Sequence, residues 1–77
     1  SAIDNNGNAL VRGDIFSYDN SGNIFNISPG KIAVLQGLKD YIVVDSEDVL
    51  LVVKKDEEQN IKYYLEDLKK STKEKFL

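Results

Sequence analysis

Short apolar segments separated by turn residues constrain the fold of this chain most strongly. They are rich in β-branched and aromatic residues, and Gly, Asn, Asp, Ser and Pro gather between them. The segments are residues 9–11 running on to 15–16, then 24–27, 32–35, 41–44 and 49–53. This spacing is typical of consecutive short β-strands. We therefore predict a mainly β fold whose strands lie within about residues 9–53.

The last two apolar segments lack a clean alternation of apolar and polar residues. A strand that is buried on both faces loses that alternation, because neither face meets water. We therefore predict that residues 41–44 and 49–53 form the centre of the core.

An internal repeat links two parts of the first third of the chain. Residues 3–10 and 18–25 share the pattern Asp-Asn-x-Gly-Asn at a distance of 15 residues. Asn and Gly tolerate positive φ, and an Asp side chain can accept a hydrogen bond from the backbone two residues on. We therefore predict two similar tight turns, each leading into a strand, that stack or pair with each other. A calcium loop would need a terminal Glu that neither copy has.

The period of the apolar residues changes after residue 55. Asp56 is a candidate N-cap, and Gln59 three residues on completes a capping-box pattern. The apolar residues that follow are spaced by three and four positions, which places them on one face of a helix: Ile61, Tyr64, Leu65 and Leu68. We predict a helix over about 56–70 that packs this stripe against the strands and frays from Ser71.

Composition excludes several classes of function. The 77 residues suffice for one domain, 1–77, and contain neither His nor Cys. Nucleophile systems built on Ser–His or Cys–His and thiolate metal sites are therefore excluded. A net charge of −3 and a pI near 4.8 disfavour nucleic acid as a partner.

The sequence also shows no feature of a membrane protein. Its apolar runs are far shorter than the ~20 residues of a membrane span, and no signal peptide is visible. We therefore expect a cytoplasmic protein without a membrane partner. The chain contains no Met and begins with Ser1-Ala2, which we interpret as a tag remnant on a fragment of a longer chain.

Three groups of residues could carry chemistry, and each has a simpler structural interpretation. Asp45, Glu47 and Asp48 could hold Mg²⁺ or Ca²⁺, but the same residues form good turns between strands. Residues 28–31 could cradle a phosphate, but Pro29 removes an N–H donor and a strand follows. The aromatic residues fit a core or an interface better than a ligand platform, and they are Phe16, Tyr18, Phe25, Tyr41, Tyr63, Tyr64 and Phe76. We predict no catalytic, cofactor-binding or metal-binding residue, and an intermolecular contact at Tyr63.

Residues 37–52 and 54–62 resemble the C-terminal region of bacterial mannose-1-phosphate guanylyltransferases. The matching core is Val-Val-Asp-Ser-Glu-Asp-Val-Leu-Leu-Val, where the family usually has Thr for Ser46 and Ala for Val49. Gly7-Asn8 and the Gly-Asp-Ile stretch that starts at residue 13 extend the resemblance over about residues 5–68.

The resemblance implies a parent enzyme that makes GDP-mannose and pyrophosphate from GTP and mannose 1-phosphate in an N-terminal Rossmann-like domain. That domain would hold a Gly-Thr-Arg loop, a phosphate-binding Lys and Asp-bound Mg²⁺, and none of these motifs occurs here. The implied role of this chain is a partial left-handed β-helix-like stack, capped by one helix, that packs on the catalytic domain and supports a dimer. A free-standing β-domain for protein or carbohydrate binding is the alternative.

Overall fold

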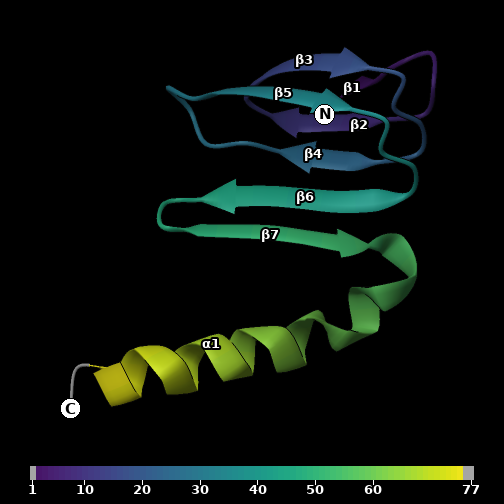
Figure 1. The fold of residues 1–77 in the computed structure, drawn as a ribbon. Coiled ribbons are helices and arrows are strands. Elements are labelled where there is room, and N and C mark those ends of the chain that lie inside the picture. The colour runs from purple at the N-terminus through teal and green to yellow at the C-terminus, as the bar shows by residue number, and fades with distance from the viewer. Residues whose placement is uncertain (1, 76–77) are drawn as a thin grey trace.

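The computed structural model describes the backbone of residues 2–75 and the side chains of residues 2–71. Seven short strands precede a 3₁₀ turn and one α-helix (Figure 1). The elements are β1 (Ala2–Ile3), β2 (Ala9–Arg12), β3 (Asp14–Tyr18), β4 (Ile24–Asn26), β5 (Ile32–Gln36), β6 (Tyr41–Ser46), β7 (Val49–Lys54), η1 (Lys55–Asn60) and α1 (Ile61–Lys75). The predicted fold class, mainly β with one C-terminal helix, is confirmed.

The strands wind between two sheets. One sheet has the order β1-β2-β4-β6-β7, and the other contains β3 beside β5. The chain therefore passes from the first sheet to the second and back again, so that each coil lies on the one before it. The stacked pairs β2–β4, β4–β6 and β3–β5 are all parallel, and a parallel bridge from Ser21 to Lys39 closes a third side. This winding is that of a short β-helix; its left-handed sense stays a prediction.

The length of one coil differs along the stack. Ile24 lies beside Ile42 and Asp14 beside Ile32, so these coils repeat every 18 residues. Ala9 lies beside Ile24, which is the 15-residue spacing of the sequence repeat, and the register then shifts between Leu10 and Arg12. The predicted stacking of the two repeat copies is therefore confirmed. Among the described coils, the first is the shorter one.

Gly13 makes the corner between β2 and β3. Its φ of +104° is a conformation that L side chains rarely adopt. A Cβ atom at this position would lie 2.6 Å from both the Cβ and the carbonyl oxygen of Ile27 in the next coil. Only glycine lets the two coils approach this closely.

The core lies between the two sheets. Phe25, Ile27 and Val43 are buried, with Phe25 fully inaccessible to solvent. Partly buried side chains from both sheets and their connections surround them: Leu10, Ile15, Ala33, Leu35, Leu38 and Tyr41. The core is thus small, and it depends on residues that face inward from successive coils.

The prediction for the centre of the core is correct for β6 and wrong for β7. Ile42 and Val43 in β6 are buried, whereas Leu50 and Val52 in β7 are 65% and 49% exposed. The reason is topological: β7 is an edge strand that pairs only with β6. A run of apolar residues in this strand therefore marks an uncovered surface.

The helical segment begins differently from the prediction. The 3₁₀ turn η1 starts after Lys54, which has an extended backbone and makes no side-chain capping bond, so the predicted cap at Asp56 is wrong. Glu57 instead accepts hydrogen bonds from Tyr64 Oη at 2.6 Å and from Asn60 Nδ2 at 3.4 Å, which joins η1 to α1. The backbone stays helical to Lys75, beyond the predicted end near residue 70.

The helix α1 turns back along the β6–β7 hairpin (Figure 1). Leu65 and Leu68 line a groove that they share with Val44 and Leu51 of the hairpin. These two leucines nevertheless remain 41% and 40% exposed. Leu65 and Leu68 of the predicted apolar stripe thus face the hairpin, but the predicted packing of the stripe against the strands is incomplete.

Candidate docking surface at the open end of the stack

Buried asparagines hold successive coils together. Asn8 and Asn23, the equivalent residues of the two repeat copies, have no solvent-exposed surface. The side-chain and backbone N–H groups of Asn23 both donate to Asn8 Oδ1, at 2.9 and 3.0 Å. Asn23 Nδ2 also donates to the carbonyl oxygen of Leu38, and Asn23 Oδ1 accepts from the backbone N–H of Tyr41. Asn23 therefore connects the coil before it to the coil after it.

Asn20 makes a second set of bonds between coils. Its Nδ2 donates to Ser17 Oγ at 2.7 Å and to the carbonyl oxygen of Leu35 at 2.8 Å, and its Oδ1 accepts from the backbone N–H of Leu38. Among the described side chains, no buried nitrogen or oxygen atom lacks a hydrogen-bond partner. The polar interior is therefore satisfied by this chain's own groups.

The first turn uses its carboxylate internally. Asp4 Oδ1 accepts hydrogen bonds from the backbone N–H groups of Asn6 and Asn8, both at 2.9 Å. Further bonds from the Asn8 side chain contribute most to holding the pKa of Asp4 below its ordinary value. This arrangement is the turn that the sequence predicted, with Asp bonding the backbone two residues on.

An apolar groove opens at the opposite end of the stack, between β5 and the β6–β7 hairpin. We call it the end groove, and its lining is Ile27, Lys31, Ala33, Val34, Leu35, Leu38, Val43, Asp45, Asp48, Val49, Leu50 and Val52. Its volume is about 430 Å³. Most of these residues are aliphatic, and the charged ones gather where β6 and β7 turn. The buried core residues Ile27 and Val43 form part of its lining.

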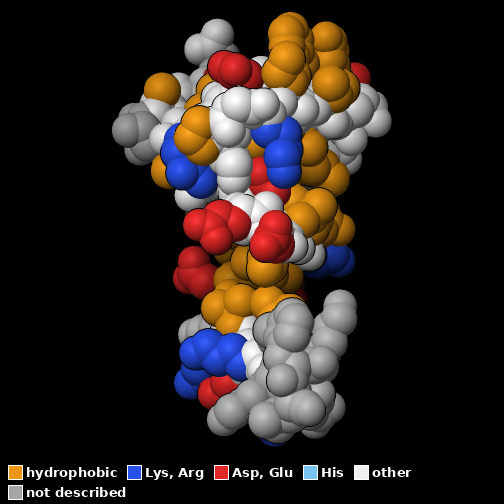
Figure 2. Space-filling model, turned by 90° about the vertical axis from the view of Figure 1, so that its left-hand side faces the viewer, with side chains coloured by type: hydrophobic (Ala, Val, Ile, Leu, Met, Phe, Trp, Pro, Cys, Tyr) orange, Lys and Arg blue, Asp and Glu red, His pale blue; other side chains and the backbone are white. Residues whose placement is uncertain are grey.

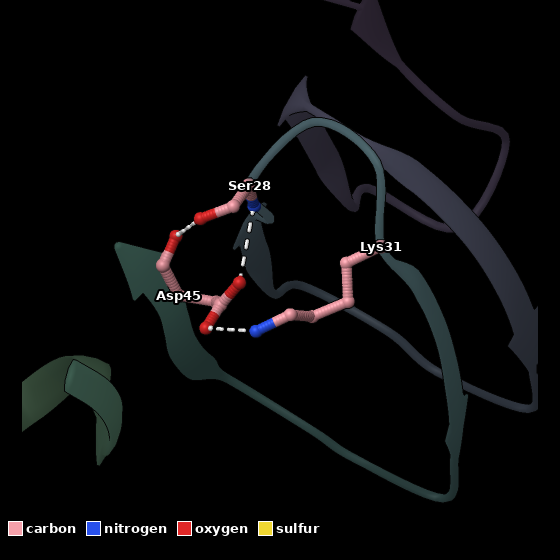
Figure 3. Close-up of polar contacts among 3 residues, drawn as sticks. All are labelled: Ser28, Lys31 and Asp45. Carbon is pink, nitrogen blue, oxygen red and sulfur yellow. Dashed lines mark hydrogen bonds and ion pairs between the residues drawn. The ribbon is translucent and has the colours of Figure 1, made fainter. Parts of the chain in front are cut away.

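A polar cluster closes the charged end of the end groove (Figure 3). Asp45 lies at the end of β6 and is only 5% exposed. Its Oδ1 accepts from Lys31 Nζ at 3.1 Å, and its Oδ2 accepts from the backbone N–H of Ser28 at 3.3 Å. Ser28 Oγ in turn donates to the backbone carbonyl oxygen of Asp45 at 2.8 Å. The β4–β5 loop is thereby fastened to the strand of the next coil.

The hydrogen bond from Lys31 holds the pKa of the Asp45 carboxyl group below its ordinary value of 3.8. Burial acts in the opposite direction, and the Ser28 donors add to the lowering. Asp45 is therefore a carboxylate at neutral pH, and its charge is matched by Lys31.

The structure separates the three carboxylates that the sequence brings together. Asp45 points into the stack, whereas Glu47 and Asp48 lie exposed in the hairpin turn, with Glu47 at a φ of +52°. Among the side chains of residues 2–71, no group of three acidic residues is placed to hold a metal ion. The interpretation as a turn is correct for Glu47 and Asp48, whereas Asp45 belongs to strand β6. The sequence did not predict the contacts of Ser28 and Lys31 with Asp45. An 18-residue period would have indicated them, because it places Ile27, next to Ser28, beside Asp45 in the following coil.

Exposed apolar side chains also cover the outer face of the β3–β5 sheet. Phe16 and Tyr18 on β3 are both 53% exposed, and Ile32 and Val34 on β5 are 65% and 69% exposed. Figure 2 shows hydrophobic side chains at the surface of the stack and again between the stack and the helix. Such patches are typical of surfaces that contact another protein surface.

The aromatic residues divide between core and surface, and an interface role for the exposed ones stays a prediction. Phe25 is at the centre of the core, and Tyr41 packs against it. Tyr63 is 52% exposed, and the ammonium group of Lys62 lies 5.1 Å from the centre of its ring. The intermolecular contact predicted for Tyr63 stays a prediction, and Phe76 lies outside the described residues.

A family model for the MannoseP isomerase/GMP-like beta-helix domain matches residues 13–68. This match covers most of the chain, including the strands from β3 to β7 and the first half of α1. The chain belongs to this β-helix domain family. The winding described above is therefore that of the family, and the resemblance inferred from the sequence is confirmed.

Two curated proteins are similar to most of this chain. The Alginate biosynthesis protein AlgA of Pseudomonas aeruginosa is 36% identical over 67 residues, and the Mannose-1-phosphate guanylyltransferase 2 of Escherichia coli O157:H7 is 33% identical over 60 residues. The alignments cover 87% and 78% of this chain but only 14% and 12% of those proteins. The chain thus corresponds to a small part of each relative.

A solved structure shares the fold. It is described as a mannose-1-phosphate geranyltransferase from Thermus thermophilus, and it superposes with a TM-score of 0.75 at 22% identity. The match covers 86% of this chain and 20% of the Thermus chain.

In the part of the chain that the structure describes, no helix has the length and apolar character needed to cross a membrane.

Proposed function

We propose that this chain is the non-catalytic C-terminal domain of a nucleotidyltransferase that makes GDP-mannose and pyrophosphate from GTP and mannose 1-phosphate. Its role is to pack on the N-terminal catalytic domain and to support assembly of a dimer. The Escherichia coli relative carries the name of this activity, and this chain is similar to 12% of its length. The remaining length leaves ample room for a separate catalytic domain.

The observation that carries the proposal is the contrast between a satisfied polar interior and uncovered apolar surfaces. A small domain with few buried apolar residues has little stability in reserve. This chain nevertheless leaves Ile32, Val34 and Leu50 at least 65% exposed. Covering them against another domain or subunit would remove apolar surface from water and stabilise both partners.

The residue types of the chain fit a scaffolding role. It contains no His or Cys, and Asp4, Asp45 and Glu57 accept hydrogen bonds from their own neighbours. On this proposal, Mg²⁺ and the groups that bind GTP belong to the catalytic domain. The β-helix domain affects the reaction only by positioning the catalytic domain.

The experiment compares the longer protein with a version that lacks this domain. We expect removal to lower GDP-mannose formation at least tenfold and to convert a dimer into a monomer, while GTP binding by the remaining part persists. Pyrophosphate release and light scattering report the two effects, and GTP binding shows that the remaining part has folded. The proposal would be contradicted if the version without this domain kept the turnover of the longer protein and stayed a dimer by light scattering. GTP-dependent pyrophosphate release by the isolated 77 residues would contradict it as well.

A further inference from the structure

We propose that the end groove receives an extended segment of the longer polypeptide, from outside these 77 residues, that pairs with the free edge of β5. The inserted segment would place apolar side chains against Leu50 and Val52. This inference rests on the proposed function, because it specifies how the domain is joined to the rest of the protein.

The first argument is the free edge of β5. The sheet that contains β5 has β3 as its only other strand among the described residues, so one edge of β5 has no strand beside it. The backbone N–H of Gly37 donates to the carbonyl oxygen of Tyr18 in β3. Backbone groups of successive residues in a strand point to opposite edges, so those of Val34 and Gln36 point to the free edge.

Nothing in β5 protects this edge. Natural sheets discourage unwanted pairing at an edge with Lys, Pro, bulges or inward-pointing charges. The sequence of β5 is Ile-Ala-Val-Leu-Gln, which contains none of these residues, and its register with β3 is regular. Unprotected edges of this kind accept an added strand through main-chain hydrogen bonds.

The second argument is the position that the chain leaves vacant. Residues of β3 lie beside residues of β5 that follow 18 positions later, as Asp14 does beside Ile32. If the winding continued with the same spacing, residues 50–54 would lie beside β5 on its other edge. These residues instead form most of β7, which pairs antiparallel with β6. The next position on the second sheet is therefore not filled by the described part of the chain. The end groove lies there, with Ala33 and Leu35 on one side and Leu50 and Val52 on the other.

The third argument concerns the occupant. The β6–β7 hairpin and α1 extend past β5 at this end of the stack (Figure 1). A second copy of the domain that approached β5 edge to edge would meet these elements. A single extended strand needs far less room, and the relatives contain most of their length outside the matched region. The longer polypeptide itself is thus the fitting source of the strand.

The lining of the groove sets the chemistry of the segment. Its walls are aliphatic, so the inserted strand should carry uncharged apolar residues at alternate positions. Lys31, Asp45 and Asp48 at the charged end sum to a charge of −1 at neutral pH. A Lys or Arg in the segment near Asp48 would complement this charge.

The first test places a small photoreactive diazirine amino acid at position 50 in the longer protein. The matched control carries it at Ile3, which is 73% exposed and belongs to β1 at the far edge of the five-stranded sheet. We expect irradiation to link position 50, but not position 3, to one peptide outside the 77 residues, identified by mass spectrometry. A link to a peptide within the 77 residues, or no link at all, would overturn the inference.

The second test removes the hydrogen bonds of the edge. Val34→Pro deletes an N–H that points away from β3, and proline is tolerated at such a position in an edge strand. Val34→Thr keeps the N–H and is the control. In the longer protein we expect the Gln36 amide to exchange with deuterium at least tenfold more slowly than an exposed amide, and Val34→Pro, but not Val34→Thr, to abolish that protection.

Unprotected exchange at Gln36 in the longer protein would defeat the inference. Failure of the strand-insertion inference is distinguishable from failure of the proposed function. If removing the whole domain abolishes dimer formation while position 50 forms no link, the assembly role stands and the strand insertion is wrong.

Discussion

The coils around Asn23 and the end formed by β7 and α1 differ in how far their side chains are buried and hydrogen-bonded. In the coils, both the Nδ2 and the Oδ1 atoms of Asn23 form hydrogen bonds within this chain, and the nearby Phe25 is fully buried. At the other end, Leu50 and Leu68 are 65% and 40% exposed although both are apolar. The difference separates coils whose side chains are satisfied within the chain from an end whose apolar side chains stay uncovered. The following three substitutions test that division.

The largest effect is expected in the core. Phe25→Ala should lower the free energy of unfolding by about 3–5 kcal/mol, because it removes a buried aromatic ring and leaves a cavity. The matched change Phe16→Ala affects a ring that is 53% exposed and should cost less than about 1 kcal/mol. Urea denaturation followed by circular dichroism measures both. Equal losses would show that Phe16 is as important to the isolated fold as Phe25.

The second effect concerns the bonds between coils. Asn23→Ala should cost about 3 kcal/mol, because the carbonyl oxygen of Leu38 and the N–H of Tyr41 lose their partner. Asn26→Ala, which breaks only an exposed bond to Arg12, should cost less than about 0.5 kcal/mol. The same denaturation experiment compares the two, and a loss for Asn23→Ala as small as that for Asn26→Ala would refute the role of the buried bonds.

The smallest effect is a change in acid sensitivity. The folded-state pKa of Asp45 is lowered, so its carboxylate contributes stability above the ordinary value of 3.8, and this contribution is lost as pH falls through the folded-state value. Asp45→Asn should therefore flatten the decline of stability between about pH 5 and pH 2. Asp19→Asn removes one negative charge at an exposed position and is the control for the change in net charge. Melting temperatures recorded across this range test the prediction, and parallel curves for the parent chain and Asp45→Asn would refute it.

The sequence predicts the local structure well, because its signals are local. Strand positions, the turn at Asp4 and the helical stripe follow from the spacing of apolar residues and from turn chemistry. The second copy of the repeat differs from the predicted tight turn: Asp19 has a φ of +56°, and the backbone N–H of Gly22 donates to Asn6 of the first copy. Burial of β7 could not be predicted, because a run such as Val-Leu-Leu-Val-Val looks the same in a central strand as in an uncovered edge strand. The predicted start of the helical segment was wrong because the chain leaves β7 directly into η1, where Lys54 is the N-cap residue and its side chain makes no capping bond.

The candidate surface was harder to predict, because it depends on the period of the coil. The 15-residue repeat is the visible signal, but Asp45 meets Ser28 and Lys31 only through the 18-residue spacing that follows. That spacing carries no repeated sequence motif in this chain. Contacts between coils therefore need a structure, whereas contacts within a turn can be inferred from the residues alone.

The reversal at Glu47 and Asp48 also decides how long this stack can become. A solenoid whose last coil ended in parallel register would offer each molecule a surface that matches the beginning of the next one, and head-to-tail contacts of that kind produce open filaments. Here β7 runs against β6, and β1 likewise runs against β2, so both edge strands of the first sheet depart from the parallel register of the coils between them. The two-residue turn between β6 and β7 thus ends the parallel winding of the described residues.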